Sequence, residues 1–301
     1  MKIVRYEPNM AEDLAEVFND AVAEVPHCFH VDQETFSEEL LPAGGGKSTK
    51  KRLHSEAGFV ARSGESINGF SHVAIEDPKK EGDPKLGAIR FLWYSPGDRV
   101  TGQKLLDASQ EYLAGLGLNR ILAFHQDYRY PFFGFKHSYL SDHLGQIQAL
   151  LWINGYERVK GEVFLDWPNF NPIEPPEPEV EVDIELEWTK GMGELPGLVV
   201  TASAGGKKIG VCECVSCGEF SKVREVQDWA FTEWIGVENE YQGRGLGRYL
   251  LRRALREMHG IGYRNAGIST DWKNYRAFVF YTNFGYHVVD WTHAYGREFD
   301  L

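Results

Sequence analysis

The stretch that decides the fold is residues 235–251, I-G-V-E-N-E-Y-Q-G-R-G-L-G-R-Y-L-L. The residues before it, 228–237, are apolar and aromatic and predict a short buried strand. After it, apolar residues recur at helical spacing as far as Gly260. Between the two lies Gln242, followed by the glycine-rich run G-R-G-L-G. Glycine lacks a Cβ, so backbone N–H groups can turn toward one point at a helix N-terminus, where an anion is favoured. The stretch therefore predicts a site for a pyrophosphate.

The spacing of the glycines separates two kinds of phosphate turn. A dinucleotide-binding turn needs G-x-G-x-x-G and an acidic residue about 20 positions further on. Here the pattern from Gln242 to Gly247 is Q-x-x-G-x-G. It resembles motif A of the GNAT superfamily of N-acetyltransferases, R/Q-x-x-G-x-G/A, in which the turn holds the pyrophosphate of acetyl-CoA. The alternative is an ordinary glycine-rich turn between strand and helix.

A second motif follows in residues 274–286, N-Y-R-A-F-V-F-Y-T-N-F-G-Y. It resembles GNAT motif B, N-x-x-A-x-x-x-Y-x-x-x-G-F/Y, at each defined position. Asn274, Ala277 and Tyr281 fall on one side of a helix. The alternative for Tyr281 is a core tyrosine, which is the commoner fate of this residue. Because the two motifs occur in the right order and spacing, the chain is identified as a member of the GNAT superfamily.

The resemblance implies an α/β fold with a central mixed β-sheet flanked by helices. It implies acetyl-CoA as co-substrate and no metal. Arg244 and Arg248 lie close enough to the turn to help hold CoA phosphates, whereas Arg252 and Arg256 fit a solvated helix face. The residues expected to contact the cofactor are Ile235, Val237, Gln242, Gly243, Arg244, Gly245, Leu246, Gly247, Arg248 and Asn274.

The reaction implied is attack of an acceptor amine on the thioester carbonyl. Amines with a pKa near ~10 are mostly protonated at neutral pH, so a base or a water relay is needed. Glu233 is the candidate base because it shares strand parity with Ile235 and Val237. The family commonly has its glutamate two residues earlier, where Phe231 stands, and a surface or salt-bridged Glu233 is the alternative. Tyr281 is the candidate general acid for the leaving thiolate, by proton transfer or by hydrogen bonding.

Composition excludes several other classes. The chain has 301 residues and a formal net charge of −12, which argues against nucleic acid as the main partner and favours a cationic substrate such as an amine. No stretch approaches the roughly 20 apolar residues of a membrane span, and the N-terminus lacks a secretory signal, so a cytoplasmic protein is expected. The three cysteines of C-E-C-V-S-C (212–217) lack an evident fourth zinc ligand. The run G-G-G-K-S (44–48) lacks the first glycine of a P-loop and is expected to be a basic loop.

The chain also contains an internal repeat. An offset of 145 residues takes Gly102 to Gly247, and an offset of 130 takes Gly155-Tyr156 to Gly285-Tyr286. Two GNAT-like domains are therefore expected. The proposed division is a degenerate N-terminal domain at 1–168, a Pro/Glu-rich linker at 169–179 and a catalytic domain at 180–301.

The first copy lacks the residues that the site needs. Val100 stands where Gly245 is expected, Gly97 replaces Gln242, Leu144 replaces Asn274 and Leu151 replaces Tyr281. This copy is expected to be non-catalytic. Its extra segment, about 126–142, is aromatic and is expected to supply part of the acceptor pocket; its candidate residues are Tyr128, Tyr130, Phe132 and Phe133.

The leading hypothesis is therefore an acetyl-CoA-dependent N-acetyltransferase acting on a small-molecule amine. The alternative is an acyl-CoA-binding regulatory protein without turnover, which intact Tyr281 and Asn274 disfavour. Several acceptors fit the sequence, including a small amine, an aminoglycoside, a thiol-sugar amine and a peptide N-terminus. No motif specifies the oligomeric state.

Overall fold

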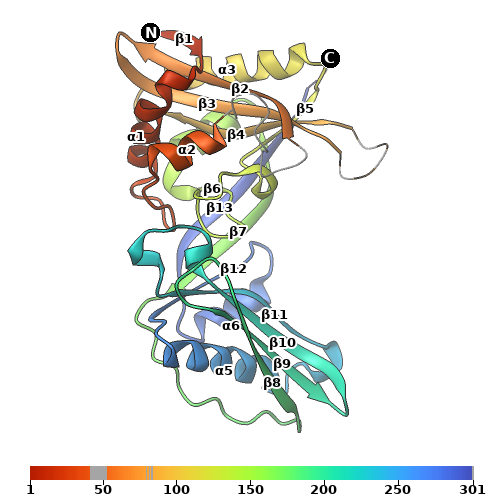
Figure 1. Ribbon diagram of the computed structural model, residues 1–301. Coiled ribbons are helices and arrows are strands. Elements are labelled where there is room, and N and C mark those ends of the chain that lie inside the picture. Colours follow the sequence, from red (N-terminus) through yellow and green to blue (C-terminus); the bar gives the residue numbers. More distant parts are fainter. Residues whose placement is uncertain (41–52, 79, 81, 83, 300–301) are drawn as a thin grey trace. The chain divides into compact units, whose positions relative to one another are not determined.

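The computed structural model describes residues 1–40, 53–78, 80, 82 and 84–299, and the run at 44–48 lies outside these residues. The chain divides into two compact units, residues 1–162 with 290–301 and residues 163–289. The division falls inside two strands, β7 (Glu157–Trp167) and β13 (His287–Glu298) (Figure 1). The sequence predicts the boundary between the two domains at 169–179 instead. That segment belongs to the second unit, where the Phe170 N–H donates to the Arg264 carbonyl at 2.9 Å and the Glu179 N–H donates to the Arg244 carbonyl at 3.1 Å.

The first unit is a mixed sheet with helices. Its strands run in the order β1-β2-β3-β4-β5-β13, with β4 and β5 parallel, their neighbours antiparallel, and the short β6 paired with β13. Its strands are β1 (Lys2–Arg5), β2 (Leu53–Ser63), β3 (Ser66–Glu76), β4 (Leu86–Tyr94), β5 (Arg120–Ala123) and β6 (Leu140–Ser141). Its α-helices are α1 (Ala11–Val22), α2 (Gln33–Glu39), α3 (Arg99–Gly115) and α4 (Gly145–Ile153). Its 3-10 helices are η1 (Pro8–Met10), η2 (Gln126–Tyr128) and η3 (Asp142–Leu144).

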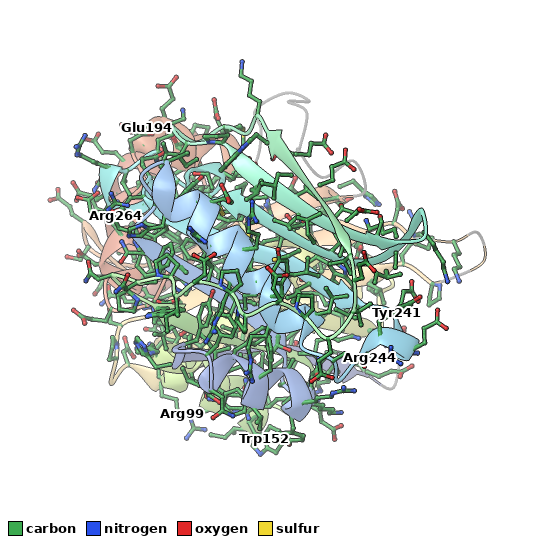
Figure 2. The ribbon with its side chains drawn as sticks, turned by 90° about the horizontal axis from the view of Figure 1, so that it is seen from below. Arg99, Trp152, Glu194, Tyr241, Arg244 and Arg264 are labelled. Carbon is green, nitrogen blue, oxygen red and sulfur yellow. The ribbon has the colours of Figure 1, made fainter. Side chains whose placement is uncertain are left out.

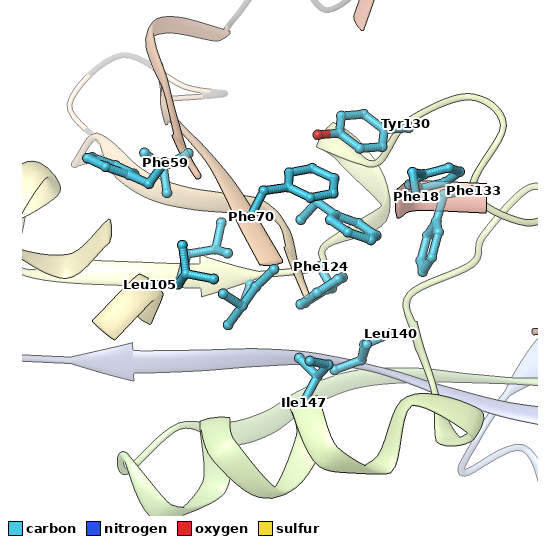
Figure 3. Close-up of a cluster of buried hydrophobic side chains, with 14 of the residues drawn as sticks. Phe18, Phe59, Phe70, Leu105, Phe124, Tyr130, Phe133, Leu140 and Ile147 are labelled. Atoms are coloured by element: carbon cyan, nitrogen blue, oxygen red, sulfur yellow. The ribbon is translucent and has the colours of Figure 1, made fainter. Parts of the chain in front are cut away.

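Aromatic rings fill the core of this unit (Figure 3). Phe18 of α1 contacts Phe91 at 5.3 Å and Phe132 at 5.2 Å between ring centroids. Tyr130 stacks on Phe132 at 5.3 Å. The aromatic residues of the extra segment are thus buried in the core of the first unit, because their large apolar rings complete its packing. The expectation that they line an acceptor pocket is not supported by this position.

The strands of the second unit run in the order β12-β11-β10-β9-β8, and this part of the sheet is called the second sheet below. Strands β8 to β11 are antiparallel neighbours, and β11 pairs with β12 in parallel. Its strands are β8 (Asp183–Thr189), β9 (Gly197–Ala204), β10 (Lys207–Ser216), β11 (Trp229–Val237) and β12 (Asn265–Asp271). Its helices are α5 (Leu246–Gly260), α6 (Tyr275–Thr282), and the 3-10 helices η4 (Cys217–Glu219), η5 (Arg224–Val226) and η6 (Asn239–Tyr241).

Strand register gives the second sheet two different faces. Helix α5 packs on β9, β10 and β11. On the α5 side, a Cβ on Gly210 would lie 2.9 Å from Leu250 Cδ1, and Gly210 is paired with Val237. Val237 and Ile235 therefore point toward α5, whereas Trp234 and Gly236 point to the opposite face. Figure 2 shows α5 crossing the strands, with Arg244 at one end and Arg264 toward the other.

The structure confirms the predicted α/β class with mixed sheets and helices. It also shows the repeat in detail. Asn274 is the N-cap of α6, and Leu144, 130 positions earlier, is the N-cap of α4. Gly285 and Gly155 both follow these helices with positive φ, at 130° and 76°. Both turns need glycine because other residues rarely adopt this conformation.

Candidate functional site

A cavity of about 780 Å³ lies in the second unit. Three elements surround it: the end of β11, the glycine turn before α5, and α6. A volume of this size suits a small-molecule ligand. The lining residues are Glu179, Trp234, Ile235, Gly236, Val237, Gln242, Gly243, Gly245, Gly247, Arg248, Asn274, Arg276, Ala277, Phe280 and Tyr281.

The glycine turn has the conformation that its sequence predicts. Gly243 and Gly245 have φ of 80° and 81°, in the left-handed region. Gln242 holds the turn in place, because its Nε2 donates to the Val237 carbonyl at 2.8 Å and to Asn239 Oδ1 at 3.1 Å. A Cβ on Gly243 would meet nothing within 4 Å, so this glycine is required by its φ and not by crowding.

The N-terminus of α5 faces this turn with no side chain to cap it. Its N-cap is Gly245, and the Tyr249 N–H makes the first helical bond, to the Gly245 carbonyl at 3.0 Å. The preceding N–H groups of the first turn are available for an anion. Arg248 and Arg276 line the same cavity, while the Arg244 guanidinium lies 6.0 Å from the ring of Tyr241 (Figure 2). This end of the cavity therefore fits a phosphate group.

Strands β11 and β12 pair only along their first halves. Their register runs from Trp229↔Asn265 to Thr232↔Ile268, although β11 continues to Val237 and β12 to Asp271. The residues of β11 beyond this point, 234–237, line the cavity. The backbone of β11 is thus free of its parallel neighbour where an extended ligand would need hydrogen-bonding partners.

Helix α6 places Tyr281 at the cavity. The helix is started by Asn274, whose Oδ1 accepts a hydrogen bond from the Ala277 N–H at 3.2 Å. Tyr281 is 6% exposed and packs on Phe280 and Tyr286, with centroids 5.3 and 6.2 Å away. The ring is fixed by this packing while the residue still lines the cavity.

Glu233 lies at an irregularity of β11. In the β10–β11 ladder Glu213 pairs with Trp234 and Cys214 pairs with Thr232, so Glu233 is the extra residue of a β-bulge. The bulge shifts the alternation by one residue, and Thr232 shares the α5 face with Ile235. Glu233 is half-buried and is not among the residues that line the cavity. The bulge therefore removes the regular alternation on which the parity argument for Glu233 depends.

Two other residues predicted to contact the cofactor, Leu246 and Arg244, also lie outside the cavity lining. Leu246 is 1% exposed and is part of the core under α5. Arg252 lies over the Phe284 ring at 5.4 Å, and Arg256 forms an ion pair with Glu174. Arg244 lies beside the turn but is not among the lining residues. The basic row along α5 is thus divided between the cavity and contacts with neighbouring segments.

The corresponding helix of the first unit is capped by its own side chain. Asp98, the N-cap of α3, accepts from the Thr101 N–H at 3.1 Å and from Thr101 Oγ1 at 2.5 Å. A carboxylate thus occupies the place where α5 offers free N–H groups. Val100 and Leu151 lie on this unit's α3 and α4, as the repeat predicts.

No group of three or more potential His, Cys, Asp or Glu metal ligands occurs among the described residues. Cys212, Cys214 and Cys217 are free and buried. In the same part of the chain, no helix has the length and apolar character required to cross a membrane.

Residues 162–286 match the model of the acetyltransferase (GNAT) family. Almost the whole of the second unit, together with Glu162 of the first, thus carries the sequence pattern of this family. The matched residues include the whole cavity lining. By sequence alone, the chain matches none of the curated proteins with which it was compared.

Solved structures show the same fold over nearly all of the chain. A tandem GNAT protein from the clavulanic acid biosynthesis pathway is 14% identical, with a TM-score of 0.64 over 99% of this chain and 98% of that one. A GCN5-related N-acetyltransferase from Sphaerobacter thermophilus is 13% identical, with a TM-score of 0.61 over 99% and 95%.

A third structure is a glucosamine N-acetyltransferase region of a fungal multi-domain GH3 β-N-acetylglucosaminidase. It is 14% identical, with a TM-score of 0.63 over 98% of this chain. The chain spans 38% of the length of that protein. The tandem arrangement predicted from the repeat is thus found in solved structures.

The cavity lining includes residues that were not predicted as site residues, among them Trp234, Phe280, Arg276 and Glu179. Trp234 and Phe280 look like ordinary apolar residues of a strand and a helix, and Arg276 looks like a surface residue. Glu179 lies in the proline-rich segment, whose position beside the turn is not encoded in any local pattern. Of these, only Arg276 could have been predicted from the sequence, since it lies two residues after Asn274 within the second motif.

Proposed function

We propose that this protein is an acetyl-CoA-dependent N-acetyltransferase that transfers the acetyl group directly to a primary amine. One observation carries the proposal. The same cavity is lined by Gln242 and the glycines of the 242–247 turn and by Tyr281. The turn fits a pyrophosphate, and the tyrosine hydroxyl fits a departing sulfur. Acetyl-CoA would supply the thioester that the amine attacks.

The binding roles follow from the geometry. The N–H groups at the N-terminus of α5 and the guanidinium groups of Arg248 and Arg276 would hold the phosphates. The free edge of β11 at Ile235 and Val237 would bind the extended part of the donor through backbone groups. Asn274 would act indirectly, because its side chain holds the start of α6 and so positions Tyr281.

Tyr281 would stabilise the thiolate that forms when the thioester breaks. A thiol has a pKa of about 8.5 and a tyrosine about 10, so full proton transfer would be uphill by roughly 2 kcal/mol for ordinary groups. A hydrogen bond from the Tyr281 hydroxyl to the developing thiolate achieves the same charge stabilisation. Either role needs the fixed ring position that the structure shows.

The acceptor amine must lose a proton. We propose that Glu233 takes it through a water molecule, because this half-buried carboxylate adjoins the cavity residue Trp234 in the chain. The β-bulge that holds Glu233 is a feature that commonly occurs next to active sites. We place the reaction in the cytoplasm, since all four cysteines are free thiols.

The test is a free-thiol assay on the full chain with acetyl-CoA and a panel of primary amines, followed by mass measurement of the acceptor. We expect amine-dependent release of CoA and an acceptor heavier by one acetyl group. Calorimetry with acetyl-CoA on the same preparation separates the alternatives. Binding without release for any amine would identify a regulatory protein, and absence of binding would overturn the assignment of the cavity.

A further inference from the structure

The face of the second sheet that points away from α5 carries carboxylates and few apolar side chains. Register aligns Glu187, Val199, Glu213 and Trp234 in one row across β8 to β11. The next row contains Glu185, Thr201, Val211 and Gly236. The α5 face has buried Leu198, Val200, Ala202 and Cys212 at the alternating positions. The face under α5 is therefore apolar and buried, whereas the opposite face carries carboxylates and is not covered by α5.

This face, called the open face below, is exposed along β8, whereas Val211 on β10 is buried. Glu185 and Glu187 are exposed, and Glu213 is half-buried. Within the described part of the chain, these three carboxylates form neither an ion pair nor a hydrogen bond. The strands place one cation on this face, Lys208, which lies opposite Ser203 in the strand register. Asp183 lies on the other side of Ser203 in the same row. In the two strand rows that contain Trp234 and Gly236, the charged residues are therefore all carboxylates, while the cavity that Trp234 also lines contains Arg248 and Arg276.

Trp234 connects this face to the cavity. It is 60% exposed and lines the cavity, yet its side chain starts on the open face. Its Nε1 would lie 3.1 Å from a Cβ on Gly236, so the indole lies along β11 over the Gly236 backbone. An exposed indole attracts an ammonium ion through its π-face. Glu213 is its direct neighbour on β10, about 5 Å away across the ladder.

We propose that the acceptor is a small polyamine and that it docks on this open face. One amine would enter the cavity beside Trp234, while the remaining ammonium groups would lie along the row of Glu213 and Glu187 and on Glu185. The proposal rests on the proposed acetyltransferase function and specifies its acceptor. The match is one of charge: an acceptor with several positive charges meets a face whose carboxylates lack partners, next to an exposed aromatic ring.

The probe is spermidine, with butylamine as the single-charge comparison. Calorimetry on the full chain at low salt should show tighter binding of spermidine than of butylamine. Glu213→Gln should weaken spermidine binding about 1.5- to 5-fold, the range for one exposed ion pair. The triple change Glu185→Gln, Glu187→Gln, Glu213→Gln should weaken it about tenfold or more, and Trp234→Leu should weaken both amines. The matched control is Glu225→Gln, an exposed glutamate on η5, which should have no effect.

The same preparations distinguish failure of this inference from failure of the proposed function. Equal affinity for the two amines, or unchanged spermidine binding in the folded triple variant, would overturn the docking face even if acetyl transfer occurs. Selective spermidine binding that the triple variant loses, without CoA release, would support the face and count against turnover. Weakening by Glu225→Gln to the same extent would show a general charge effect and also overturn the inference.

Discussion

The Nε2 of Gln242 donates a 2.8 Å hydrogen bond to the carbonyl oxygen of Val237, which ties the glycine turn to the end of β11. Gln242→Ala removes this bond and the bond to Asn239. We expect a stability loss of about 1 kcal/mol and weaker acetyl-CoA binding, because the turn loses its fixed position. Calorimetry and a thermal melt measure both. Gln110→Ala, which removes a hydrogen bond to Tyr156 in the first unit, should lower stability without weakening CoA binding.

Gly245→Val tests the anion site at α5. The φ of 81° is unfavourable for a β-branched residue, by about 1–2 kcal/mol. Gly206→Val is the matched control, since Gly206 has a φ of 78° in the β9–β10 turn; its would-be Cβ has nothing within 4 Å, and that of Gly245 has only Pro178 Cα, in ordinary contact at 3.9 Å. We expect similar losses of melting temperature in both variants and a strong loss of acetyl-CoA affinity in Gly245→Val only. Equal CoA affinity in the two folded variants would contradict the site.

Tyr281→Phe tests the role of the hydroxyl. The ring is retained, so packing on Phe280 and Tyr286 should survive. We expect kcat to fall by roughly 10²- to 10⁴-fold, with little change in the KM for acetyl-CoA, because the interaction forms mainly as the thiolate develops. Tyr286→Phe removes the hydroxyl of the neighbouring buried ring and should leave kcat nearly unchanged. A stable Tyr281→Phe enzyme with full turnover would identify Tyr281 as a packing residue.

The capped helix in the first unit predicts one acetyl-CoA site per chain. Asp98 already satisfies the start of α3 through Thr101, and its negative charge would repel a phosphate. Calorimetry should give a stoichiometry of one. Asp98→Ala should lower stability, because the helix loses its N-cap, without creating a second site. Two equivalent sites in the unmodified chain would refute this comparison of the two units.

Asp290 should make stability depend on pH. Burial raises the pKa of this carboxyl to about 6, although hydrogen bonds from Ser141 and from the Asp142 N–H act in the opposite direction. In an unfolded chain the value is about 3.9. The folded state therefore holds the proton more tightly, and this contribution is fully present below about pH 4 and is lost as pH rises through 6.

Asp290→Asn should consequently be more stable than the unmodified chain at pH 8, by up to about 3 kcal/mol, and nearly equal to it at pH 4. Denaturant unfolding at the two pH values measures the difference. Asp20→Asn, at an exposed position on α1, is the control and should show no such change between the two pH values. A constant difference for Asp290→Asn would mean that the carboxyl is not titrating in this range.

The parts of the fold that local chemistry controls could be predicted from the sequence. The β11–turn–α5 unit is specified by the glycines at 243 and 245 and by apolar residues at helical spacing. Backbone conformation and amphipathicity are determined by residues that are close in the sequence. The second motif likewise specified α6, which begins after its N-cap, Asn274. These elements bring most of the candidate residues around one cavity.

Non-local features could not be predicted in this way. The bulge at Glu233 depends on how β11 pairs with β10, and no residue type in that stretch requires it. Assigning Glu179 to the cavity depends on a hydrogen bond to Arg244 across 65 positions of sequence. The rings of 128–133 look like pocket residues by composition, but the space available in the first unit's core determined their position.

Strand β13 has a consequence for how the protein is made. Residues 292–298 pair with β5 and β6, so the first unit receives a strand that is synthesised after the whole second unit. On the ribosome, the edge of β5 that pairs with β13 stays unpaired until β13 has been synthesised. An unpaired strand edge is a template for wrong pairing with other chains. The amino-terminal half would thus be most vulnerable to aggregation during translation, and its completion would depend on the far end of the same polypeptide.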